Sequence, residues 1–201
     1  MRVLVTGFDP FDNEPINPSW EAVQLLPDRL GELELVKRQL PTSFTRAVAE
    51  LEDLLASSAF DFAVHVGQHG GVSAIQVERV AINLANARIC DNDGFSPKEQ
   101  PVVAGAPTAY FASLPTQQMV AAICSAGIPA QASFSAGTFV CNTTMFAALH
   151  LAATKYPQLR AGFIHVPYLP QQVADRPLVA SMSLEMIAQG LEAALKVLSD
   201  Y

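Results

Sequence analysis

The chain has 201 residues, of which 50% are hydrophobic and 15% are charged, a composition that can bury a full core and excludes a disordered protein. Its net charge is −7, and no cluster of Lys and Arg marks a surface for nucleic acid. No apolar run reaches the length of a membrane span, and residues 1–7 are typical of a first strand rather than of a signal peptide.

Short apolar runs typical of strands alternate along the chain with stretches of helical spacing. In chain order we predict a strand at 3–6, a helix at 18–26, a strand at 34–39, a helix at 43–56, a strand at 62–66, a helix at 116–126, a strand at 130–134, a helix at 142–155, a strand at 162–166 and a helix at 183–199. This alternation favours the α/β class, with a largely parallel sheet covered on both faces. No linker or repeat interrupts the chain, so we expect one domain over residues 1–201.

One region, residues 67–115, breaks the alternation. It contains an extended run at 74–83 and polar loops marked by Gly or Pro at 91–94 and 104–107. We expect an antiparallel excursion with long loops, which is a usual place for a site in an α/β fold.

Cys141 follows the small, turn-forming residues 136–138 and directly precedes a predicted helix. The free N–H groups and the dipole at a helix start lower the pKa of a thiol, and the same N–H groups can hold an oxyanion. A small buried hydrophobic residue is the competing interpretation. The other cysteines, Cys90 and Cys124, form no CxxC spacing, so we predict no disulfide framework and a reduced, cytoplasmic protein.

A cysteine nucleophile needs a base, and the base benefits from a third group that orients it. His165 ends an apolar strand, which places its imidazole near the edge of a parallel sheet where such folds bind ligands. A catalytic and a structural role are equally open for it. His65 lies inside a strand, His69 lies in a Gly-rich loop, and His150 lies too far along the helix to meet the thiol.

Glu78 lies among apolar neighbours in the extended run, so we expect it to be partly buried and to have a partner. Spacing alone favours an ion pair with Arg79 or Arg88 over a catalytic role. Phe8 and Phe11 present a similar choice, because they either wall a small apolar pocket or anchor their loop on the core.

Metal and phosphate sites find little support in the sequence. His65 and His69 are four residues apart, but a strand and a Gly-rich loop do not give the helical spacing of a zinc motif. The first strand is followed by the single Gly7 rather than by a glycine-rich phosphate loop. The residues alone therefore give little support to a zinc site or to a glycine-rich phosphate loop.

Eight motifs, in chain order, resemble the pyroglutamyl peptidase I (pyrrolidone-carboxylate peptidase) family of cysteine peptidases. They are GFDPF at 7–11, NPSW at 17–20, VGQ at 66–68, ERVAIN at 78–83, ARI at 87–89, DN at 91–92, AGTFVCN at 136–142 and GFIH at 162–165. The resemblance covers nearly the whole chain, from residue 1 to about residue 185.

The resemblance implies a triad with Cys141 as nucleophile, His165 as base and Glu78 as the orienting acid. It implies a cysteine exopeptidase that removes N-terminal pyroglutamate from peptides through a thioester acyl-enzyme. Arg88 and the backbone N–H of Cys141 would hold the oxyanion. The family fold is a single α/β domain with a twisted, mixed sheet between helices, and its members form dimers or tetramers without metal or cofactor.

The resemblance also assigns the substrate site. Phe8 and Phe11, together with the backbone of the VGQ loop at Gln68, would bind the lactam ring, and Asn17 would order the loop that carries the two Phe residues. A site that hydrogen-bonds the lactam N–H and C=O rejects proline, because polar groups of the site would be left unpaired. The expected partners are pyroglutamyl peptides and further copies of the chain, with neither nucleic acid nor membrane.

The chain departs from the family pattern at His69, Val72, Cys90 and Asp12, and at Thr143 and Thr144 after the nucleophile. The departures at His69 and Val72 leave room for a related cysteine amidase or hydrolase that acts on another small lactam or amide. A third hypothesis is a catalytically silent binding protein in which Cys141 is structural.

Overall fold

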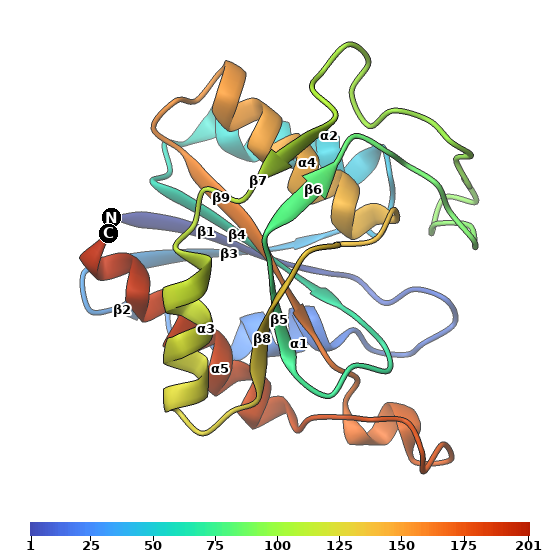
Figure 1. Ribbon diagram of the computed structural model, residues 1–201, viewed down its shortest axis with the longest axis vertical. Helices are drawn as coiled ribbons and strands as arrows, with labels where there is room; N and C mark the ends of the chain where they lie inside the picture. The colour runs from blue at the N-terminus through green and yellow to red at the C-terminus, as the bar shows by residue number, and fades with distance from the viewer.

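The computed structural model of the protein describes residues 1–201, and a seven-stranded sheet lies at its centre (Figure 1). The strands, in their order across the sheet, are β2 (Arg29–Leu30), β3 (Leu33–Leu40), β1 (Arg2–Phe8), β4 (Phe62–Gln68), β9 (Arg160–Val166), β5 (Ile75–Glu78) and β8 (Ala130–Ser133). β3, β1, β4 and β9 run parallel to one another, and β8 runs parallel to β5. β2 is antiparallel to β3, and β5 is antiparallel to β9. The sheet is therefore mixed and mostly parallel.

Helices cover both faces of the sheet, as Figure 1 shows. The helices α1 (Pro18–Leu25), α3 (Thr116–Ser125) and α5 (Leu184–Lys196) pack on one face, and α2 (Arg46–Ser57) and α4 (Val140–Thr154) pack on the other. Each face has its own apolar core, of 26 and 22 buried residues. Val3 and Val5 of β1 enter the first core and Leu4 and Phe8 enter the second, which explains the unbroken apolar runs of the strands.

The helix α4 is buried around most of its circumference. It lies against β9 and β4 of the sheet, beside α2, and under a separate antiparallel pair formed by β6 (Val80–Ile82) and β7 (Ala109–Phe111). Its first turn therefore lies inside the protein, at the edge of the sheet where β4 and β9 end. None of the helices is both long enough and apolar enough to cross a membrane.

The α/β class, the single domain and the predicted alternation of elements are confirmed. The extended run at 74–83 is divided between two sheets, with β5 in one and β6 in the other. Arg79 lies between these strands and bonds to both sides: its N–H donates to Ser133 O at 2.7 Å, and its C=O accepts from Ala112 N at 2.9 Å. The sequence reading missed β2, β7 and the short 3-10 helix η1 (Pro170–Val173), which are too short to carry a periodic pattern.

Candidate active site

The three predicted catalytic residues come from three different elements that meet at one edge of the sheet. His165 lies near the end of β9, Glu78 ends β5, and Cys141 lies in the first turn of α4. β5 and β9 are direct neighbours with Gln76 opposite His165. The end of β5, which carries Glu78, therefore lies close to the imidazole of His165 on β9.

His165 and Glu78 form a buried pair. Nδ1 of His165 lies 2.8 Å from Oε1 of Glu78, and the two residues are 4% and 0% exposed. A carboxylate only accepts, so it places the imidazole proton on Nδ1 and leaves Nε2 free to take a proton. The second oxygen of Glu78, Oε2, is buried without a hydrogen-bond partner.

The alternative ion pairs for Glu78 are wrong. Arg79 donates instead to Thr116 Oγ1 at 3.1 Å, and Arg88 is exposed on its loop. Glu78 therefore depends on His165 for its side-chain hydrogen bond.

Cys141 and His165 line one cavity of about 430 Å³. Behind the sulfur lies Gly67, where a Cβ atom would come within 2.8 Å of Cys141 Sγ and 2.7 Å of Phe163 Cζ. Only glycine leaves room for the thiol and the aromatic ring together, which explains why glycine stands at position 67 of the VGQ motif.

The pKa of the Cys141 thiol is raised to about 12, mainly because burial disfavours the thiolate and further because of the negative charge of Glu78. The backbone N–H of Cys141 lowers it only in part. The expectation of a low thiol pKa from the helix start is thus wrong for the free protein, since desolvation can exceed the modest effect of a helix dipole. Burial also lowers the pKa of His165, although Glu78 opposes this shift. At neutral pH these two shifts favour the uncharged thiol and the uncharged imidazole.

The predicted substrate residues gather beside the thiol. Phe8, Phe11, Asn17 and Gln68 line a second, small cavity of about 10 Å³ that Cys141 also borders. That volume holds about one water molecule. Phe8 is 2% exposed and packs on Phe163 at a centroid distance of 6.2 Å, so it both anchors the loop on the core and walls the cavity.

Asn17 orders the loop between β1 and α1. Its Oδ1 accepts the N–H of Ser19 at 3.1 Å, which caps α1, and its Nδ2 donates to Asp9 O at 2.9 Å. In the same loop Asp12 and Asn13 have φ values of 53° and 61°. Asp tolerates this left-handed conformation better than most residues, which explains how Asp12 stands where the family often has Gly.

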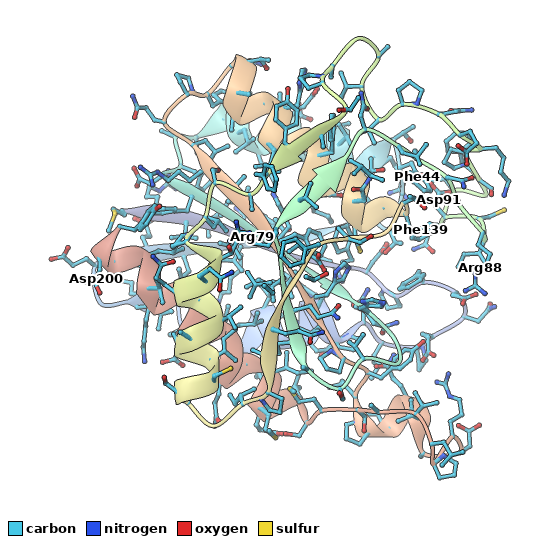
Figure 2. All side chains as sticks on the ribbon, viewed as in Figure 1. Phe44, Arg79, Arg88, Asp91, Phe139 and Asp200 are labelled. Atoms are coloured by element: carbon cyan, nitrogen blue, oxygen red, sulfur yellow. The ribbon has the colours of Figure 1, made fainter.

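Arg88 and Cys141 line different cavities. Arg88 lines an adjoining cavity of about 430 Å³ with Phe11, Gln68 and His69, and does not line the cavity shared by Cys141 and His165. Figure 2 shows Arg88 at the edge of the molecule, outside Phe139, which lies near the start of α4. Its oxyanion role stays a prediction. The N–H of Cys141, in the first turn of α4, has no partner within the helix.

The sequence reading missed the role of Asn142. It is fully buried, and its side chain bonds both the N–H and the C=O of Ile82, each at 2.9 Å. These bonds fix the first turn of α4 to the strand that follows Glu78. An amide in the first turn of a helix with few polar residues was the available signal.

The remaining histidines have structural partners. His65 Nδ1 contacts Thr6 Oγ1 at 2.8 Å, and His150 Nδ1 contacts Tyr110 Oη at 3.0 Å. His69 is closer to the chemistry, because its ring centre lies 5.2 Å from that of His165 while its Nδ1 contacts Gln76 Oε1 at 2.7 Å.

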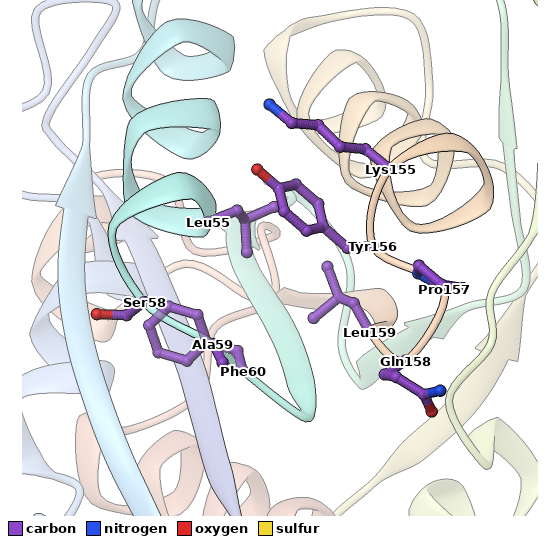
Figure 3. A pocket seen from close by; sticks show the side chains of 9 residues that line it. All are labelled: Leu55, Ser58, Ala59, Phe60, Lys155, Tyr156, Pro157, Gln158 and Leu159. Atoms are coloured by element: carbon purple, nitrogen blue, oxygen red, sulfur yellow. The ribbon is translucent and has the colours of Figure 1, made fainter.

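A separate cavity of about 240 Å³ lies between the ends of α2 and α4 (Figure 3). It is lined by Leu55, Ser58, Ala59, Phe60, Lys155, Tyr156, Pro157, Gln158 and Leu159. No cysteine or histidine lines it, so it is not the candidate active site. No group of three or more His, Cys, Asp and Glu side chains is arranged to hold a metal ion.

Known proteins resemble the chain over its full length. The family model for pyroglutamyl peptidase matches residues 1–201. Pyrrolidone-carboxylate peptidase of Staphylococcus aureus (strain Newman) is 48% identical over 200 residues, which cover 100% of this chain and 94% of the relative. That of Enterococcus faecalis (strain ATCC 700802 / V583) is 48% identical over 204 residues, covering 100% and 96%.

Solved structures agree. The crystal structure of Bacillus amyloliquefaciens pyroglutamyl peptidase I matches with a TM-score of 0.96 at 41% identity, covering 100% of this chain and 97% of that one. A mutant pyrrolidone carboxyl peptidase from P. furiosus matches with a TM-score of 0.95 at 42% identity, covering 100% and 99%. The chain belongs to the pyroglutamyl peptidase family of cysteine-type peptidases.

Proposed function

We propose that the protein is a cysteine exopeptidase that removes N-terminal pyroglutamate from peptides, with residues 1–201 as one catalytic domain. The observation that carries the proposal is the 2.8 Å pair of His165 Nδ1 and Glu78 Oε1 beside a cavity that also holds Cys141. Thiol catalysis requires a nucleophile, a base and a group that orients the base, and Cys141, His165 and Glu78 are the residues we assign to these roles.

In the first step, Cys141 Sγ attacks the carbonyl carbon that joins the lactam ring to the next residue. The thiol proton moves to His165 Nε2 as the C–S bond forms, because thiol and imidazole start in their neutral forms. The carbonyl oxygen becomes an oxyanion, which the Cys141 backbone N–H and Arg88 stabilise. Glu78 stabilises the imidazolium that forms.

The tetrahedral intermediate then collapses. The C–N bond breaks, the departing amine takes the proton from His165, and a thioester of Cys141 remains. His165 next removes a proton from a water molecule, which attacks the thioester. The C–S bond breaks, pyroglutamate leaves, and the thiol regains its proton.

The small cavity beside Cys141 supports pyroglutamate as the group recognised. Its lining has no charged side chain, and Phe8, Phe11 and Phe139 suit a neutral ring. Gln68 in the same lining offers polar groups for the lactam N–H and C=O, whereas the side chains of Asn17 and Thr42 already donate to Asp9 O. At about 10 Å³ the cavity must widen to admit the ring, and Phe11, half-buried on its loop, is the side chain best placed to move.

The direct test is hydrolysis of a chromogenic pyroglutamyl amide by the wild type and by Cys141→Ala. We expect activity to be abolished in Cys141→Ala and retained in Cys124→Ala, which removes an exposed thiol outside the site. Mass spectrometry after acid quenching should detect a pyroglutamyl adduct on the wild type only. Full activity in Cys141→Ala would overturn the mechanism.

The alternative is a related amidase for another small lactam or amide, which His69 favours because it stands beside His165 where the family often has a small residue. A panel of prolyl and pyroglutamyl amides separates the two functions, since equal cleavage contradicts the pyroglutamyl assignment. Slow, incomplete alkylation of Cys141 at neutral pH, together with no hydrolysis, would instead support the silent binding protein.

We also propose a cytoplasmic homodimer or homotetramer that acts on peptides and binds neither nucleic acid nor membrane. Support comes from the net charge of −7 and from three cysteines that are all free. The large apolar side chains of Phe111 and Phe134, which are 71% and 68% exposed, suit contacts between copies. Analytical ultracentrifugation tests the assembly.

A further inference from the structure

Gln172 lies outside every motif that carries the family resemblance, yet it touches the site. It belongs to η1, the short 3-10 helix that follows β9, and is 8% exposed. Its side chain meets Gln68 at the end of β4 and Glu14 in the loop between β1 and α1. A buried amide that joins three segments so far apart in the chain calls for an explanation.

The orientation of the Gln172 amide is fixed by its backbone neighbour. The N–H of Leu169 lies 2.9 Å from the Gln172 side chain. A backbone N–H only donates, so the atom that it meets is Oε1. The amide nitrogen Nε2 therefore faces the other way, where it lies 2.9 Å from Gln68 and 3.2 Å from Glu14 Oε2.

A second, independent contact requires the same orientation. The Glu14 carboxylate only accepts, so it selects the nitrogen of Gln172. Arg176 holds this carboxylate from the other side, with Nη2 3.4 Å from Glu14 Oε1, and also donates to the backbone oxygen of Gln172. The segment after β9 is thereby tied to the loop that carries Phe11.

The orientation of Gln68 follows from that of Gln172. Because Gln172 Nε2 donates, the atom of Gln68 that receives this bond is Oε1. The amide nitrogen of Gln68 is then the free end of the side chain. Gln68 lines both the small cavity of Phe8 and Phe11 and the larger cavity of Cys141 and His165.

We propose that Gln172 is a positioning residue that holds Gln68 as a hydrogen-bond donor toward a carbonyl oxygen of the bound substrate. The inference rests on the proposed function and adds to it a specificity device. The Leu169 N–H fixes the orientation of the Gln172 amide, and the Gln172 amide in turn fixes the orientation of the Gln68 amide. A substrate that presents an acceptor to Gln68 is favoured, and one that presents a donor is disfavoured.

The variant Gln172→Glu tests this polarity with little change in shape. One oxygen of the new carboxylate still accepts from Leu169, but the other offers lone pairs to Gln68. The Gln68 amide must turn to donate to it, and so presents its oxygen to the substrate. We expect KM for a pyroglutamyl amide to rise about tenfold or more while kcat changes less than about threefold, since only substrate recognition loses a bond.

Two further variants make the result decisive. Gln171→Glu makes the same charge change one residue away at an exposed position of η1, and we expect its KM to match the wild type. Adding Glu14→Gln to Gln172→Glu removes the repulsion between carboxylates but leaves Gln68 turned. We therefore expect the double variant to have a higher melting temperature than Gln172→Glu, while its KM stays raised.

The assay separates this inference from the proposed function. A wild type that does not cleave the pyroglutamyl amide refutes the proposed function itself. An active wild type with an unchanged KM in Gln172→Glu overturns only the role of Gln172. Recovery of KM in the double variant also overturns it, because charge repulsion rather than amide polarity would then be the cause.

Discussion

The protein contains two buried histidines on neighbouring strands, and they differ in their partners. His65 on β4 meets the hydroxyl of Thr6 at 2.8 Å, and His165 on β9 meets the carboxylate of Glu78 at the same distance. The ring of Phe163 lies close to both, 6.5 Å and 4.8 Å from their ring centres. Burial lowers both pKa values, to about 4 for His65, whereas Glu78 opposes the shift at His165.

The two histidines are both buried and differ in two other respects, a neighbouring carboxylate and access to a cavity, which are the features that base chemistry uses. His65 lines none of the cavities of the site, and its Nε2 is buried without a partner. His165 borders the cavity of Cys141 and can pass a proton to a substrate.

Replacing Glu78 with Gln gives His165 an uncharged partner like that of His65. The variant keeps the size of the side chain but removes the charge that stabilises the imidazolium, so we expect kcat for a pyroglutamyl amide to fall about 10³-fold. The matched control is Thr6→Val, which removes the partner of His65 and should lower the free energy of unfolding by about 1–3 kcal/mol with kcat nearly unchanged. Comparable kcat losses in both variants would contradict the assigned roles.

Acid should destabilise the protein through His65. Its pKa is about 4 in the folded state and about 6.5 when unfolded, so between these values the unfolded chain binds the proton first. The free energy of unfolding therefore keeps its full value above about pH 6.5 and falls by roughly 3 kcal/mol as pH drops toward 4. Urea unfolding across this range should show a shallower pH dependence in His65→Asn, and an equal slope in both proteins would remove His65 as the cause.

Gly67→Ala tests how closely the thiol is packed. The new Cβ would press on Cys141 Sγ and on the Phe163 ring, so we expect kcat to fall about 10–100-fold as the nucleophile is displaced. Gly190→Ala is the control, because its Cβ would meet the flexible end of Ile75 at 2.4 Å, away from the site. It should lower the melting temperature and leave kcat near the wild-type value.

The smallest expected effect comes from His69. Its charge is one cause that lowers the pKa of His165, so His69→Ala should raise that pKa. Because the proposed mechanism uses neutral His165 as the base, the acid limb of the kcat profile should move to higher pH, by less than about one unit. His150→Ala, which lies on α4 beside Tyr110, should leave this limb in place. A shift to lower pH would contradict the assignment.

The sequence predicted those parts of the molecule that depend on local patterns and ordered motifs. Apolar periodicity located the long strands and helices, and the motifs named Cys141, His165 and Glu78, which the structure brings to one edge of the sheet. The raised thiol pKa was not predictable, because it depends on how completely neighbouring segments cover the sulfur. The contact between Gln68 and Gln172 joins residues 104 positions apart, and no local pattern reports it.

The unpartnered oxygen of Glu78 has a consequence for engineering the protein. A buried carboxylate with one oxygen unbonded is costly in the resting fold, but its negative field reaches His165 undiminished by any other donor. The carboxylate attracts the imidazole of His165 most strongly when that imidazole carries a positive charge. A stabilised variant that supplied a donor to Oε2 would thus gain melting temperature and lose turnover, so selection for heat resistance alone would tend to weaken the catalyst.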